Sequence, residues 1–165
     1  MTSVSEHPRD EHPRGVRRPP VGIPRRLLIA SGAFGGELTA SQVADAIARG
    51  LRDGGRGELD LCPLEHEQAD DGVRELLDAL NFDARMRGAR AVIVAAAQLE
   101  RRALAGSVTF ELATRARQGG VPAYAVTGAN ALNLFDARIL DLQIILEAPG
   151  RRALVSAGCR LAELV

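Results

Sequence analysis

A glycine-rich bend is the stretch of this sequence whose residue types best suit contact with a phosphate. Residues 31–42 read SGAFGGELTASQ and follow a short apolar run. Glycines let the backbone approach a ligand closely, and a helix that begins near Thr39 would direct free N–H groups at an anion. The candidate cofactor-binding residues in this bend are Gly32, Gly35 and Gly36.

Two features of the bend oppose phosphate binding. The glycine spacing matches neither the G-x-G-x-x-G pattern nor the Walker pattern, and the chain contains no lysine for the latter. Glu37 also stands where an anion would have to sit. The alternative to a phosphate site is therefore a plain turn between a strand and a helix.

A second candidate lies at the end of the most apolar run. Residues 91–97 read AVIVAAA, which is apolar on both faces and typical of an interior strand of a parallel sheet. Ligands of such sheets bind at the carboxyl ends of the strands. Glu100 is the carboxylate nearest this end, so it is the candidate general base. The alternative is a solvated glutamate beside Arg101 and Arg102.

Three other polar stretches have simpler interpretations. Residues 127–130 (TGAN) favour a turn after a strand. Residues 65–67 (EHE) favour a solvated loop, because adjacent side chains diverge. The pair at 70–71 (DD) is typical of a helix N-terminus. None of these stretches predicts a metal site.

The apolar pattern predicts the elements that position the candidate residues. Strand-like runs occupy residues 26–30, 58–64, 91–97, 121–126 and 141–146. A capping box at Thr39 and Gln42 opens a helix, and Gly54 ends it. Later helices are expected from about residue 70, over about 108–118 and over about 151–164. This alternation predicts an α/β fold: a single doubly wound, Rossmann-like, mainly parallel sheet with helices on both faces.

Composition places the chain among ordinary globular proteins. Residues 1–24 are rich in proline and charge, so we predict a disordered tail followed by one domain over residues 25–165. The formal net charge is zero, which gives no basic field for nucleic acid, and no run is apolar enough to span a membrane. Cys62 and Cys159 are far apart in sequence and are interpreted as thiols in a reducing compartment, so a cytoplasmic location is expected.

Several stretches, taken in order, resemble the glycerate kinase family. Residues 30–40 (ASGAFGGELTA) occupy the frame of a family motif close to A-P-D-S-F-K-G-S-L-S-A, and residues 43–51 match the helix that follows it. Residues 92–100 (VIVAAAQLE) line up with a strand that ends in a G-E-G-R-L-D motif. The resemblance implies ATP-dependent phosphorylation of glycerate, a small organic acid, with magnesium. It also adds Gln98 to the candidate cofactor-binding residues and gives Glu100 the role of base or magnesium contact.

The chain departs from the family at the positions that carry this chemistry. The motif's aspartate is Gly32 and its lysine is Gly35, the glutamate of the second motif is Ala96, and a further lysine is Ser107. The middle part of the family, which forms a second α/β domain, is also missing. Phosphoryl transfer depends on neutralising phosphate charge, so the departures predict weakened or lost activity. The alternative function is a non-catalytic binding, regulatory or self-associating module.

The missing second domain leads to one further expectation. It would uncover the strand ends, where this chain has small or apolar residues. These residues are Ala33, Phe34, Ala95, Ala96, Ala97 and Leu99. We expect them to form an exposed apolar wall that supports a homo-oligomer, with Phe34 as its anchor.

Overall fold

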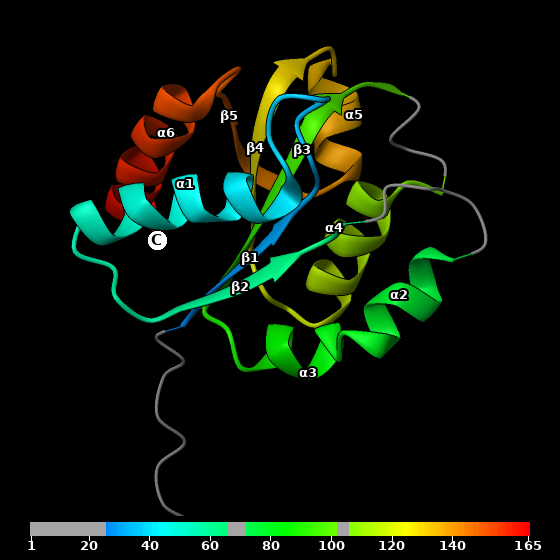
Figure 1. Cartoon of the computed structure of the whole chain (residues 1–165). Coiled ribbons are helices and arrows are strands. Elements are labelled where there is room, and N and C mark those ends of the chain that lie inside the picture. The colour runs from blue at the N-terminus through cyan, green and yellow to red at the C-terminus, as the bar shows by residue number, and fades with distance from the viewer. Residues whose placement is uncertain (1–25, 66–71, 102–105) are drawn as a thin grey trace, which may run out of the picture.

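A computed structural model describes residues 26–65, 72–101 and 106–165, and these residues form an α/β fold around a five-stranded sheet (Figure 1). The strands are β1 (Leu27–Ser31), β2 (Leu59–Pro63), β3 (Ala91–Leu99), β4 (Ala123–Asn130) and β5 (Leu142–Glu147). Their order is β2-β1-β3-β4-β5, and every neighbouring pair is parallel. The predicted doubly wound parallel sheet is confirmed. The predicted tail and the Asp70–Asp71 pair lie outside the described residues.

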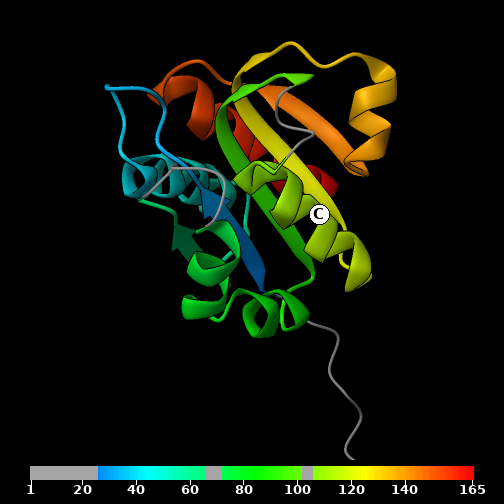
Figure 2. The same ribbon diagram turned by 90° about the vertical axis from the view of Figure 1, so that its right-hand side faces the viewer.

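Helices cover both faces of the sheet (Figures 1 and 2). The helices α1 (Ala40–Asp53) and α6 (Arg151–Leu164) pack against each other on one face. On the other face lie α2 (Val73–Ala79), α3 (Phe82–Arg87) and α4 (Val108–Gln118). The short α5 (Leu134–Ile139) connects β4 to β5, and the Arg117 side chain of α4 donates to the Ile139 carbonyl at 3.5 Å. In the described ranges, none of the helices has the length and apolar character needed to cross a bilayer.

Alternating side chains of the strands divide the core into two layers. Leu27, Ile29 and Ile93 belong to the cluster under α1 and α6, whereas Leu28 and Val92 belong to the cluster under α2, α3 and α4. Strands that are buried on both faces are typical of parallel sheets. The core therefore holds the carboxyl ends of β1, β3 and β4 at one common edge.

The helix boundaries follow the capping signals of the sequence. Thr39 caps α1 in a capping box with Gln42, as predicted, and α1 ends at Gly54. Ser107 caps α4 by accepting a hydrogen bond from the Phe110 N–H at 3.2 Å, and α4 ends at Gly119. These caps position the N-termini of both helices at the carboxyl edge of the sheet.

One prediction about local structure is wrong, and two short helices were missed. Thr127, Gly128, Ala129 and Asn130 continue β4 and do not form a turn, because β3 also extends to Leu99 and pairs with them. The short helices α3 and α5 were not predicted. Each has six residues, which is too short for a helical period to emerge from the sequence.

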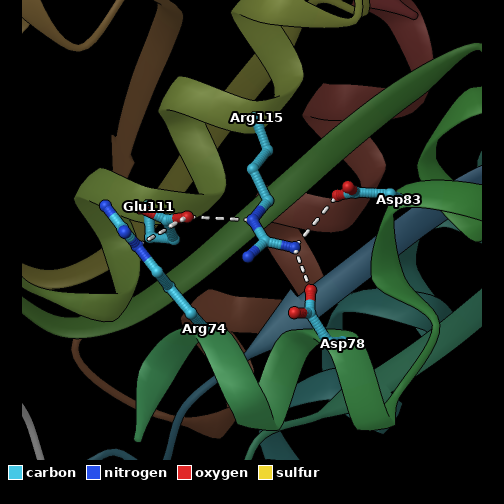
Figure 3. Close-up of polar contacts among 5 residues, drawn as sticks. All are labelled: Arg74, Asp78, Asp83, Glu111 and Arg115. Atoms are coloured by element: carbon cyan, nitrogen blue, oxygen red, sulfur yellow. Dashed lines mark hydrogen bonds and ion pairs between the residues drawn. The ribbon is translucent and has the colours of Figure 1, made fainter. Parts of the chain in front are cut away.

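Two arginines join the helices and strands of the α2–α4 face. Arg115 of α4 donates to Glu111 at 2.9 Å, to Asp78 at 2.9 Å and to Asp83 at 3.2 Å (Figure 3). Burial opposes the charged form of Arg115, but its hydrogen bonds to these three carboxylates raise its pKa above the ordinary value. On β2, the Asp60 carboxylate accepts two hydrogen bonds from the Arg85 guanidinium of α3. These contacts stabilise the packing of α2, α3 and α4.

Candidate functional site

The crevice where ligands bind in this topology lies between β1 and β3. Strand order changes direction there, and the carboxyl ends of the two strands mark the expected ligand position. Gly32 is buried at this point and its N–H donates to the Ala95 carbonyl at 2.9 Å. The described residues enclose a cavity of about 30 Å³ here, lined by Gly32, Leu64, Ala95 and Leu112, among others. A ligand site usually needs about 300 Å³ or more, so this cavity between described residues is too small to be one.

The β1–α1 loop, residues 32–39, folds back on itself. The Phe34 N–H donates to the Leu38 carbonyl at 2.9 Å, and Gly35 takes a positive φ of 59° between them. Gly35 and Gly36 are exposed, with nothing near the position of an added Cβ. The loop thus has the geometry of a tight turn whose glycines face outward.

The ring of Phe34 holds the loop against the sheet. A Cβ at Gly128 would lie 2.7 Å from the Ala97 carbonyl oxygen of β3, so the close approach of the backbone requires glycine there. The Phe34 ring lies next to this position, with its Cδ2 3.6 Å from the added Cβ. Phe34 is 8% exposed and Leu99 is 1% exposed. The expected apolar wall with Phe34 as its exposed anchor is therefore wrong, because the turn buries this side chain.

The N-terminus of α1 is occupied by side chains of the protein itself. Thr39 Oγ1 accepts from the Gln42 N–H at 3.2 Å, and Gln42 Oε1 accepts from the Thr39 N–H at 3.0 Å. Ser41 Oγ donates to Glu65 Oε1 at 2.7 Å, which places a carboxylate beside the first helical turn. A carboxylate complements the positive end of the helix dipole, so it takes the electrostatic role that a bound phosphate would have.

Gln98 and Glu100 lie beyond the crevice along β3. The last residue pair of β1 and β3 is Ser31 with Ala95, and Gln98 is about 10 Å further on at the rise of a strand. There β3 pairs with β4, and the last hydrogen bond between them runs from the Ala131 N–H to the Leu99 carbonyl at 2.7 Å. The side chains of Gln98 and Glu100 are exposed. No hydrogen bond or ion pair between described residues joins either of them to the β1–α1 loop.

The candidate residues are therefore not assembled into one pocket. Gly32 is buried, Gly35 and Gly36 lie at a loop tip, and Gln98 and Glu100 lie on an exposed strand end. Across the described ranges, no three histidine, cysteine or acidic side chains are grouped so that they could hold a metal ion. Among the residues that the structure describes, Glu100 is exposed and is not among the residues that line the cavity between β1 and β3.

A family model decides what this chain is related to. The model of the glycerate kinase family matches residues 64–151, from the end of β2 to the start of α6. The chain belongs to the glycerate kinase family. The match includes Gln98 and Glu100, whereas the β1–α1 loop lies before it.

The other comparisons give little beyond the family. Among curated proteins, none matches the chain. Among solved structures, a flavone reductase is similar, with 16% sequence identity and a TM-score of 0.45. That similarity covers 84% of this chain and 62% of the reductase chain, so this member of the glycerate kinase family spans less than two thirds of that structure's length.

The most exposed large apolar side chains among the described residues lie on α5, and the sequence did not indicate them. Leu134 is 85% exposed and Phe135 is 72% exposed, both on α5. The sequence signal is an apolar pair followed by Asp136, which does not fit the spacing of a core-facing helix. Predicted binding residues were placed at the strand ends, whereas the exposed apolar side chains gather beside the edge strand β5.

Proposed function

We propose that this member of the glycerate kinase family is a non-catalytic binding module and does not transfer phosphate. The main support for the proposal is that side chains of the protein already form hydrogen bonds at the N-terminus of α1. The capping box engages the N–H groups of Thr39 and Gln42, and the Glu65 carboxylate accepts a hydrogen bond from the Ser41 hydroxyl in the same turn. A nucleotide phosphate would have to displace these contacts and approach a negative charge.

The charge needed for phosphoryl transfer is also lacking at the family's lysine positions. Gly35 and Ser107 stand there, and Ser107 serves as the N-cap of α4. Transfer of a phosphoryl group relies on cations that neutralise charge in the transition state. Without these cations, Glu100 could accept a proton from a substrate hydroxyl, but no phosphate would be held in position for that hydroxyl to attack.

Magnesium ATP and glycerate do not fit the residues present. The cavity that the described residues form between β1 and β3 holds about 30 Å³, and the nearby loop carries Glu37 as an exposed carboxylate. We therefore assign no catalytic step to ATP in this chain. The free thiols of Cys62 and Cys159 support a reducing, cytoplasmic location for the module.

A coupled assay for ADP formation tests this proposal. Purified chain with magnesium ATP and glycerate is expected to form ADP no faster than without glycerate. The matched control is Glu100→Gln, prepared in the same way, which we expect to be indistinguishable from the unmodified chain. Glycerate-dependent ADP formation that falls about 100-fold or more in Glu100→Gln would instead establish a kinase with Glu100 as its base.

A further inference from the structure

The helix α5 is inverted relative to an ordinary surface helix. It exposes Leu134 at 85%, Phe135 at 72% and Ile139 at 39%, and the residue that it buries is Asp136. A surface helix normally turns its apolar side chains to the core and its charges to water. The three apolar residues belong to neither core cluster. This face of α5 therefore has no partner among the described residues.

A groove runs between α5 and the edge strand β5. Its volume is about 850 Å³, and its walls include Leu134, Phe135 and the four consecutive residues of 142–145. Successive side chains of a strand point to opposite faces, so contact with four in a row means that the groove follows the strand's edge. Figure 2 shows α5 and β5 together at the outer side of the sheet.

The two edges of the sheet differ in how they are protected. On β2, Arg85 Nη2 donates to the Leu61 carbonyl at 2.7 Å, and Pro63 has no N–H to offer. Both devices discourage pairing with another strand. On β5, the hydrogen bonds among described residues include no side chain that covers the outer backbone. The β5 edge is open for a further strand and is bordered by apolar side chains.

We propose that a second copy of this chain occupies the groove, with the two β5 strands paired antiparallel about a two-fold axis. A two-fold contact requires one patch that is complementary to itself. This patch has a projecting part, Leu134 and Phe135, directly beside a recess, so each copy can place its apolar pair over the groove of the other. Identical edges related by a two-fold axis pair antiparallel, and β5 supplies such an edge.

The electrostatics favour a second copy over a charged partner. Arg138 is the single charged side chain among the groove residues, and the remaining walls are apolar or carry amides. The chain has a formal net charge of zero, so two copies approach without long-range repulsion. Each Phe135 ring can bury about 150 Å² or more, and both copies contribute one. This contact is independent of whether the chain transfers phosphate.

Analytical ultracentrifugation of the full chain and three variants tests this contact. The unmodified chain is expected to dimerise at micromolar concentration. Phe135→Asp and Leu134→Ser should each weaken the dimer about 30-fold or more, because each removes a central apolar side chain. Leu164→Asp is the matched control, since Leu164 is 47% exposed on α6 outside the groove, and it should dimerise like the unmodified chain.

Hydrogen exchange on the same samples checks strand pairing. Amides of residues 142–147 are expected to become more protected as concentration rises, and this change should be absent in Phe135→Asp. Circular dichroism checks that the variants are folded. We expect them to be, because the substituted side chains are exposed. A chain that is monomeric at about 100 μM, or a dimer that Leu164→Asp disrupts and Phe135→Asp does not, would overturn the proposal.

Discussion

Replacing Gly50 or Gly158 with alanine is expected to destabilise the protein by about 3 kcal/mol or more, because α1 and α6 cross in direct backbone contact. A Cβ at Gly50 would overlap the Val155 carbonyl oxygen, and a Cβ at Gly158 would overlap the Ile47 carbonyl oxygen. These atoms belong to helix backbones, which cannot move aside as a flexible side chain can. Since small domains have a total stability of about 5–15 kcal/mol, this loss is a large share of it.

Urea unfolding followed by circular dichroism measures this loss. Gly57→Ala is the matched control, because Gly57 is exposed, has no positive φ and has nothing within 4 Å of an added Cβ. Its free energy of unfolding is expected to stay within about 1 kcal/mol of the unmodified value. Equal stability of Gly158→Ala and Gly57→Ala would contradict the close helix crossing.

Removing the Arg115 side chain is expected to cost about 2 kcal/mol. Arg115 is 12% exposed and its guanidinium satisfies Glu111, Asp78 and Asp83 (Figure 3). Arg115→Ala would leave the 20% exposed Glu111 carboxylate without its closest cation, and burial makes such a loss costly. Asp78 is 70% exposed and can be solvated, which limits the cost.

Arg74→Ala supplies the comparison for Arg115→Ala. Arg74 reaches the same Glu111 carboxylate at 3.9 Å, but its side chain is 79% exposed. Its removal is expected to change the free energy of unfolding by less than about 0.5 kcal/mol. If the two variants lose the same stability in urea, the Arg115 cluster does not hold α4 against α2 and α3 as described.

Local signals made much of the fold predictable from sequence. The capping box at Thr39 and the stop at Gly54 depend on neighbouring residues, and both are confirmed. The apolar run of β3 is buried because an interior parallel strand is covered on both faces, which its composition indicates. The doubly wound sheet follows from these elements because parallel strands require crossover helices.

The candidate site could be predicted less well, because it depends on contacts that are distant in sequence. Phe34 is buried next to Gly128 of β4, which is distant from it in sequence. The carboxylate beside α1 is Glu65, which follows β2 and meets Ser41 only in the folded chain. Periodicity could not show that α5 turns Leu134 and Phe135 outward, since a six-residue helix holds less than two turns.

Titration of magnesium ATP into the full chain by calorimetry tests whether the crevice between β1 and β3 and the N-terminus of α1 hold a nucleotide. The predicted result is no saturable heat, which corresponds to a dissociation constant weaker than about 1 mM. Saturable binding at about 10 μM or tighter would contradict this result. The capped helix, the Glu65 carboxylate and the cavity of about 30 Å³ would then have to rearrange before ATP could bind.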